Sequence, residues 1–235
     1  MIPLTVRSNY SLMWGTASIS AICKRAKQLG YRHLALTDTD NLCGLITFME
    51  ACRLENLTPI VGAEITDPEE NERAICLVKN RAGYSSLCRL ITKRHQDKAF
   101  NLKSFVPKFA KDMVVLTNNA DHLKDWHDKG IDVAAGLHRK PLPLTHRLCT
   151  TARDLNIPLI ATPGSFFLYP EDAKTHKMLR EIEKNTCLSR LTINDVAPDH
   201  SFLAAPDEYA KRFAICPEAI ENTYLIKEKL EVTGP

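Results

Sequence analysis

Seven short apolar runs, separated by segments able to form helices, are the feature that most constrains the fold of this chain. The runs lie at residues 4–7, 33–37, 59–65, 74–78, 113–117, 131–135 and 158–162. Such alternation favours an α/β fold in which parallel strands are linked by crossover helices. Seven strands fit a closed, TIM-like β/α barrel better than a small open sheet. A doubly wound sheet remains the alternative, because periodicity does not show whether a sheet closes.

Several residues indicate where the helices begin and end. Ser18 is suited to cap a helix that Gly30 would end, because serine accepts a backbone hydrogen bond and glycine adopts left-handed angles. Pro170, Pro206 and Pro217 each indicate the first turn of a later helix. We predict that the barrel occupies residues 1–200. Residues 201–235 would then form carboxyl-terminal helices that pack on the barrel or lead to a following domain.

The composition excludes several classes of protein. A chain of 235 residues with 44% hydrophobic and 25% charged residues can bury one sizeable core, and it is neither disordered nor a membrane protein. No apolar run is long enough to span a bilayer, and Met1 leads into a strand-like segment rather than the charged start and apolar core of a signal sequence. We therefore expect a cytoplasmic protein without a membrane partner. Eight cysteines occur without a C-x-x-C pair, which favours free thiols over a zinc site.

A polar turn follows the second apolar run, at the position where a barrel keeps its catalytic groups. Asp38 and Asp40 lie in this turn, and we expect Asp38, and less strongly Asp40, to accept backbone hydrogen bonds. His122 and His127 are five positions apart and do not share a helix face, so we interpret them as surface residues. His176 follows Pro170 in a predicted helix, where we expect it to cap or pack.

Residues 96–111 form a basic, irregular stretch that we predict to be a long surface loop. Basic side chains interleaved with aromatic ones can follow a single strand of nucleic acid. The alternative is a solvated loop whose phenylalanines pack on the barrel. We favour this alternative, because a net charge of +3 is small and the sequence shows no compact positive face. The residues concerned are Lys93, Arg94, His95, Lys98, Lys103, Lys108 and Lys111, with Phe100, Phe105 and Phe109.

Several segments of this chain resemble the amino-terminal PHP (polymerase and histidinol phosphatase) domain of the bacterial DNA polymerase III α subunit family. They are residues 6–12, 34–41, 59–64, 77–80 with Gly83 and Tyr84, 160–162, 169–173 with His176, and 217–223. The resemblance implies a distorted seven-stranded PHP barrel and a parent enzyme that adds deoxynucleotides to a primer in DNA replication or repair synthesis. It also implies that the polymerase carboxylates lie beyond this domain, so we expect the chain alone not to polymerise DNA.

Active members of the PHP family hold a cluster of divalent metal ions with histidine, aspartate and glutamate, and they hydrolyse phosphate esters. The resemblance places other residue types at most of these positions, namely Thr5, Arg7, Trp14, Thr39, Arg73, Asn119, Gly164 and Phe166. Only Glu64 remains as a credible ligand. Because one carboxylate cannot hold several cations, the resemblance implies a degenerate site without catalytic residues, metal or other cofactor.

The positive charge of Arg7 at this degenerate site suggests which group takes the place of the metal ions. A guanidinium at Arg7 could take over the electrostatic role of the cations, so we predict an ion pair with Glu64, since buried charges are normally partnered. The alternative is that Arg7 points to solvent. Trp14 and Phe166 would fill the volume that ligands and water otherwise occupy.

Two functions from different classes follow. The preferred one is a scaffold or binding module whose partners are the remaining polymerase domains or other replication proteins, with DNA reached through the parent protein. The other is an active phosphoesterase or 3′–5′ exonuclease dependent on zinc, manganese or magnesium. Its site would have to be rebuilt from Asp38, Asp40, Glu64 and His176.

Overall fold

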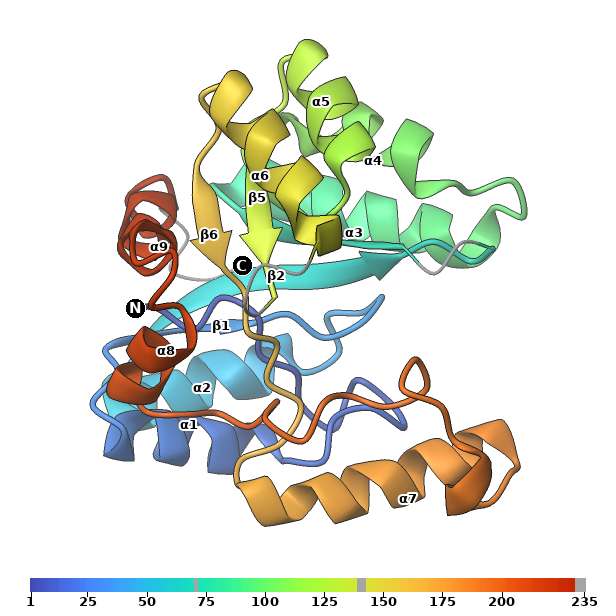
Figure 1. Ribbon diagram of the computed structural model, residues 1–235, viewed down its shortest axis with the longest axis vertical. Helices are drawn as coiled ribbons and strands as arrows, with labels where there is room; N and C mark the ends of the chain where they lie inside the picture. Colours follow the sequence, from blue (N-terminus) through green and yellow to red (C-terminus); the bar gives the residue numbers. More distant parts are fainter. Residues whose placement is uncertain (70–71, 139–142, 231–235) are drawn as a thin grey trace.

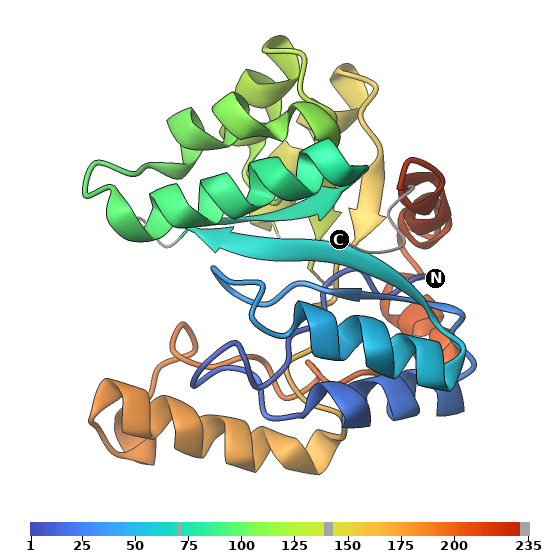
Figure 2. The same ribbon diagram turned by 180° about the vertical axis from the view of Figure 1, so that it is seen from behind.

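The structure is a computed structural model that describes residues 1–69, 72–138 and 143–230. Within these residues six strands form one curled sheet in the order β1 to β6, and helices cover its outer side (Figures 1 and 2). The protein is therefore an α/β protein, as predicted. The strands are β1 (His33–Leu36), β2 (Thr58–Thr66), β3 (Arg73–Val78), β4 (Met113–Thr117), β5 (Val133–Leu137) and β6 (Leu159–Ala161).

The helices begin and end where the sequence signals predicted. Ser18 accepts a hydrogen bond from the Ala21 amide, and Gly30 has a φ of +81° just after the first helix. Pro170 and Pro206 open the helical segments that contain them, and Pro217 directly precedes the last helix. The helices are α1 (Ile19–Gln28), α2 (Leu45–Glu55), α3 (Arg81–Gln96), α4 (Leu102–Phe109), α5 (Ala120–Asp128), α6 (Pro143–Asp154), α7 (Ala173–Lys184), α8 (Pro206–Arg212) and α9 (Glu218–Glu228), with 3-10 turns η1 (Ala110–Asp112), η2 (Pro170–Asp172) and η3 (Leu188–Arg190).

The sheet is mixed, so the prediction of parallel strands throughout is wrong. β1 and β2 are parallel, as are β4, β5 and β6, but β3 runs antiparallel to both of its neighbours. The cause is the short connection between β2 and β3, because a crossover between parallel strands needs a dozen or more residues. The prediction considered the apolar runs themselves and did not consider the length of the segment between them, so it missed this reversal.

A seventh strand is not present at residues 4–7, where only an isolated bridge joins Val6 to Ser165. The segment nevertheless lies between the two ends of the sheet. On one side the amide of Thr37 donates to the carbonyl of Val6 at 2.8 Å, and on the other the amide of Arg7 donates to the carbonyl of Ser165 at 2.9 Å. The predicted seven-stranded barrel is therefore reduced to six strands and one hydrogen-bonded segment.

Two large hydrophobic clusters stabilise the sheet, one inside its curl and one between the sheet and its helices, and a third, small cluster contains Phe166 and Phe167. Strand side chains alternate between the two faces, so Ala35 lies in the inner cluster while Leu34 and Leu36 lie in the outer one. Ile226 of α9 joins the inner cluster. The inner cluster consists of Ile2, Leu4, Ala35, Ile60, Ile75, Leu77, Val114, Leu116, Ala134, Ile160 and Ile226.

The predicted surface loop at residues 96–111 is wrong, because much of it is α4 followed by η1. Asn101 caps α4 by accepting a hydrogen bond from the amide of Ser104 at 3.0 Å. Leu102 and Val106, four residues apart, lie on one helix face and are fully buried. The lysines on the other face masked this short amphipathic pattern.

All eight cysteines are free thiols. Cys23, Cys52, Cys76 and Cys149 are buried in the apolar segments that contain them, which is how free cysteine commonly packs. Across the described part of the chain, none of the helices combines the length and the apolar character that crossing a bilayer requires.

Candidate functional site

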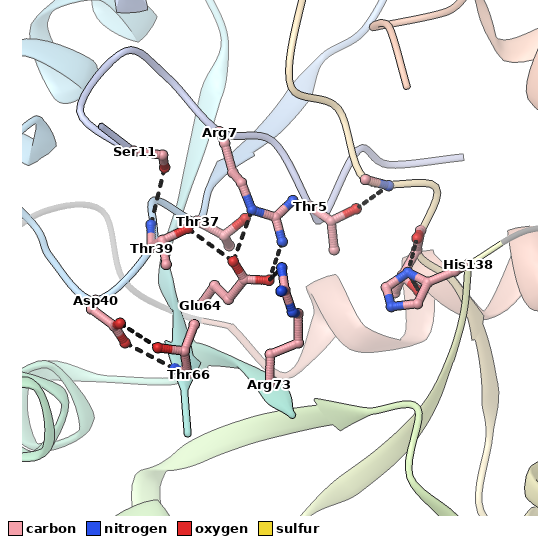
Figure 3. Close-up of polar contacts among 12 residues, drawn as sticks. Thr5, Arg7, Ser11, Thr37, Thr39, Asp40, Glu64, Thr66, Arg73 and His138 are labelled. Carbon is pink, nitrogen blue, oxygen red and sulfur yellow. Dashed lines mark hydrogen bonds and ion pairs between the residues drawn. The ribbon is translucent and has the colours of Figure 1, made fainter. Parts of the chain in front are cut away.

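The polar centre of the fold is built around Glu64, whose side chain is 1% exposed. The turn after β1 lies against β2 through a bridge between Thr39 and Glu64. Arg7 reaches the same carboxylate from the amino-terminal segment. Its Nε donates to Oε2 at 3.0 Å and its Nη2 donates to Oε1 (Figure 3). The predicted ion pair is confirmed, and Arg7 does not point to solvent.

Two further donors complete the surroundings of this carboxylate. The Thr39 hydroxyl donates to Oε2 at 2.9 Å, and Nη1 of Arg73 lies 3.5 Å from Oε1. Burial by itself would raise the pKa of Glu64. The guanidinium groups of Arg7 and Arg73 and the hydrogen bonds outweigh it and hold this pKa at about 2. Glu64 is therefore a carboxylate whose two oxygens are both bonded by the protein.

Aromatic rings pack beside the ion pair, as predicted for Trp14 and Phe166. The Arg7 guanidinium lies 4.3 Å from the centroid of the Phe166 ring, and the Trp14 ring centroid lies 5.6 Å from that of Phe166. Arg180 covers the Trp14 ring at 3.7 Å. A cavity of about 10 Å³ remains beside Glu64, which is roughly the space that one water molecule needs.

Asp38 and Asp40 accept hydrogen bonds, as predicted, but from segments beyond their own turn. Asp38 accepts from the amide and hydroxyl of Ser8, both at 2.7 Å, and from the hydroxyl of Ser11 at 2.6 Å. Asp40 accepts from the amide of Thr66 at 2.9 Å and from its hydroxyl at 2.5 Å. Burial raises the pKa of Asp40, and the bonds from Thr66 moderate this rise. Both carboxylates therefore join chain segments.

His176 packs in the protein interior, in agreement with the predicted structural role. Its Nδ1 donates to the carbonyl of Trp14 at 2.8 Å, and its Nε2 accepts from the amide of Ala197 at 2.8 Å. The residue is fully buried, and burial lowers its pKa. Both ring nitrogens are therefore occupied by backbone groups, and the ring is held neutral.

The remaining positions suggested by the resemblance divide into two groups. Thr5 and Gly164 lie beside Arg7, where the hydroxyl of Thr5 accepts from the amide of Gly164 at 3.1 Å. Asn119 caps α5 and donates to Glu72, so its side chain is engaged away from Glu64. The structure thus gathers Thr5, Arg7, Trp14, Thr39, Glu64, Arg73, Gly164 and Phe166, but not Asn119, around one centre.

One histidine of the site, His138, was not considered in the sequence analysis, and the interpretation of His122 as a surface residue is wrong. His138 directly follows β5, lines the small cavity with Glu64, and donates from Nδ1 to the carbonyl of Thr162 at 2.8 Å. Part of the residue is exposed, yet the surrounding protein and the charge of Arg7 lower its pKa. Its place at the end of an apolar run was an available signal. His122 is buried rather than on the surface, with Nε2 lying 3.0 Å from Glu72 Oε2.

No group of three or more histidine, cysteine, aspartate or glutamate side chains within residues 1–69, 72–138 and 143–230 is arranged to hold a metal ion. Around Glu64, the charges are instead one carboxylate and the two guanidinium groups of Arg7 and Arg73. Such a centre can bind and orient chain segments through charge-assisted hydrogen bonds.

Sequence comparison finds that the PHP domain profile matches residues 3–137. The DNA polymerase III subunit alpha of Borreliella burgdorferi is 26% identical over 98% of this chain, and that of Buchnera aphidicola (strain Sg) is 27% identical over 98%. An error-prone DNA polymerase of Pseudomonas fluorescens is 43% identical over 86 residues, 37% of this chain and 8% of that protein. The chain spans about a quarter of the length of the subunit alpha relatives.

Two solved structures share the fold. A presumed metal-dependent phosphoesterase from Bifidobacterium adolescentis has a TM-score of 0.50 and 12% identity, over 68% of this chain and 86% of that one. An amidohydrolase from Chromobacterium violaceum has a TM-score of 0.51 and 13% identity, over 71% of this chain and 87% of that one. At such low identity the likeness concerns the fold alone.

Proposed function

Because the chain belongs to the PHP domain family, we propose that it is a PHP domain of a DNA polymerase III α-like protein with a degenerate, metal-free site. In this proposal the domain is a scaffold or binding module in DNA replication or repair synthesis, and it does not hydrolyse phosphate esters. Its partners are the neighbouring polymerase domains. The relatives support this setting, since they are polymerase subunits that match nearly the whole chain.

The observation that carries the proposal is the pairing of Arg7 with Glu64. Metal ions are held by neutral imidazole, thiolate or carboxylate groups. Here both oxygens of Glu64 accept hydrogen bonds from protein groups. The fixed positive charges of Arg7 and Arg73 would also repel a metal cation at this carboxylate. The residues present therefore do not fit a cluster of divalent ions, and we derive no hydrolytic step from them.

The alternative reading, an active phosphoesterase or exonuclease, would need Asp38, Asp40, Glu64 and His176 to converge on metal ions. Each of them has protein partners of its own: Asp38 holds Ser8 and Ser11, Asp40 holds Thr66, and His176 bonds two backbone groups. A two-metal mechanism requires several ligands shared between ions about 4 Å apart. This arrangement of partners favours the scaffold.

Metal analysis of the purified chain, combined with activity assays, tests the proposal. After incubation with manganese or zinc and removal of free metal, we expect far less than one ion per chain by mass spectrometry. We also expect no manganese-dependent hydrolysis of a phosphate monoester or of single-stranded DNA above the background.

If metal binding and hydrolysis were detected, variants would show whether they depend on Glu64. The proposal would be overturned if the chain bound stoichiometric metal and was active, and if Glu64→Ala abolished both properties. The control is Glu69→Ala, at an exposed residue, which would have to keep both. Because Glu64→Ala can also unfold the chain, Thr39→Ala provides a milder change beside the same carboxylate. Its circular dichroism spectrum would show whether the fold is kept.

A further inference from the structure

Positive charge is concentrated in one part of the chain. Residues 81–111 carry eight lysine and arginine residues and one aspartate, a net charge of +7. The whole chain has a net charge of +3, so the remainder carries −4. The eight residues are Arg81, Arg89, Lys93, Arg94, Lys98, Lys103, Lys108 and Lys111. Such asymmetry within one chain is a signal of a polyanionic partner.

In the structure, residues 81–111 form part of the outer surface of the protein. Helices α3 and α4 pack on each other on the outer side of β2 and β3, and Figure 2 shows α3 crossing the front with α4 folded back above it. Their apolar residues, Leu87 and Leu90 of α3 and Leu102 and Val106 of α4, point inward and are fully buried. Most of the basic residues therefore lie on the solvent side of the two helices, while Lys98 lies in the connection between them and Lys111 lies in η1.

Seven of the eight basic residues are exposed. Only Arg94 turns inward, where it bonds Thr66 and lies 3.4 Å from Asp40. We call the other seven the α3–α4 basic surface: Arg81, Arg89, Lys93, Lys98, Lys103, Lys108 and Lys111. None of the seven forms an ion pair with another residue in the described ranges of the chain. Their charge is therefore not neutralised within the described structure.

The aromatic residues of this segment do not reach outward to stack on bases. Phe100 is 2% exposed, and its ring lies 4.9 Å from that of Phe105. Phe105 and Phe109 are half-buried and pack against the outer core, while Lys108 lies over the Phe105 ring at 4.3 Å. Binding of a single strand by stacking requires exposed rings, so this surface offers charge without base recognition.

We propose that the α3–α4 basic surface binds the phosphate backbone of DNA without reading its sequence. Arg81 and Lys93 are separated by about 18 Å along α3, at 1.5 Å per residue, which spans several phosphates of a duplex. The choice of DNA over another polyanion rests on the proposed relation to a polymerase, but binding does not depend on the state of the Glu64 site. An acidic protein is the competing partner.

Fluorescence anisotropy on the whole chain tests the proposal, using a labelled duplex and a labelled single strand of equal length. Wild type should bind both, with a logarithmic salt slope of about −0.9 for each duplex phosphate that it neutralises. The variant Arg89→Gln, Lys93→Gln, Lys103→Gln, Lys108→Gln removes four exposed charges. We expect its affinity to be at least tenfold weaker at low salt, and its slope to be shallower by about 0.9 for each phosphate that it no longer neutralises.

The matched control removes four exposed charges from other elements, through Lys24→Gln, Arg53→Gln, Lys174→Gln and Lys211→Gln. These residues lie on α1, α2, α7 and α8, and we expect less than a twofold change in affinity. An equal loss in the control, no measurable binding by wild type, or equally strong competition by polyglutamate at the same charge concentration would overturn the proposal. Circular dichroism on both variants confirms folding, and metal content is measured separately, so failure here is distinguishable from failure of the scaffold proposal.

Discussion

At the scale of single residues, the pairing of Arg7 with Glu64 is the clearest link between sequence and site. The two residues are distant in the chain, yet both are at most 3% exposed and make two hydrogen bonds. Removing a charge from water is costly, and the geometry of a bidentate arginine offsets part of that cost. The Arg7 Nη1 atom, which has no hydrogen-bond partner in the described part of the protein, lies near the Phe166 ring that covers this guanidinium.

Replacing Glu64 by glutamine should lower the free energy of unfolding by about 3–5 kcal/mol, because it leaves the Arg7 guanidinium buried without a counter-charge. The double variant Arg7→Met, Glu64→Leu should cost less than the single variant, since it removes both charges. Urea denaturation at neutral pH measures these changes. Glu208→Gln, which removes an exposed partner of Arg212, is the control and should cost about 0.5 kcal/mol or less. A single variant as stable as this control would contradict the argument.

The stability that Glu64 contributes should depend on pH. Its pKa is about 2 in the folded protein and 4.5 ordinarily, so the unfolded chain takes up a proton first as the pH falls. The contribution is therefore complete above about pH 4.5 and is lost as the pH falls toward about 2. It amounts to about 3 kcal/mol.

The measurement is the difference in unfolding free energy between wild type and Glu64→Gln, followed from about pH 7 to about pH 3. The difference should shrink over the acid half of this range. A difference that stays constant down to about pH 3 would mean that the pKa of Glu64 is not lowered by its partners.

At the scale of elements, α7 shows how a helix outside the sheet is held against two irregular segments of the chain. His176 on this helix bonds Trp14 in the amino-terminal loop and Ala197 in the segment after η3. The ring of one side chain is thus the hydrogen-bond partner of a backbone group in each of two irregular segments. Buried backbone groups need such partners, since an unpaired one carries a desolvation penalty.

Replacing His176 by alanine should lower the free energy of unfolding by about 2–4 kcal/mol, because two buried backbone groups lose their partners. Thermal or urea unfolding measures the loss. Lys174→Ala on the exposed side of the same helix is the control and should change stability by about 0.5 kcal/mol or less. Equal effects of the two substitutions would show that the hydrogen bonds of His176 contribute nothing.

At the scale of the whole molecule, the Glu64 centre and the α3–α4 basic surface lie in different places. The amino-terminal segment lies between β1 and the residues after β6, and brings Arg7 to the carboxylate of β2 (Figure 3). The α3–α4 basic surface lies on the outside of the same sheet. The proposed DNA contact and the Glu64 centre therefore belong to different parts of the fold, and a variant in one should leave the other intact.

The sequence by itself determined the elements with strong local signals. Six of the seven apolar runs are strands, Ser18 and Gly30 bound the first helix, and Arg7 pairs with Glu64 as charge considerations predicted. These outcomes follow from local backbone preferences and from the cost of burying a single charge, both of which can be recognised in the chain itself.

Only the tertiary structure decided the burial of His122 and the place of His138 beside Glu64, whereas the short connection before β3 already implies the reversal of that strand. Both histidine positions depend on contacts between residues distant in the chain, and neither composition nor spacing specifies such contacts. The helix α4 was also missed, because its stability comes from burying Leu102 and Val106 against the rest of the protein. Local sequence patterns determine where the strands form, and tertiary packing determines which residues surround them.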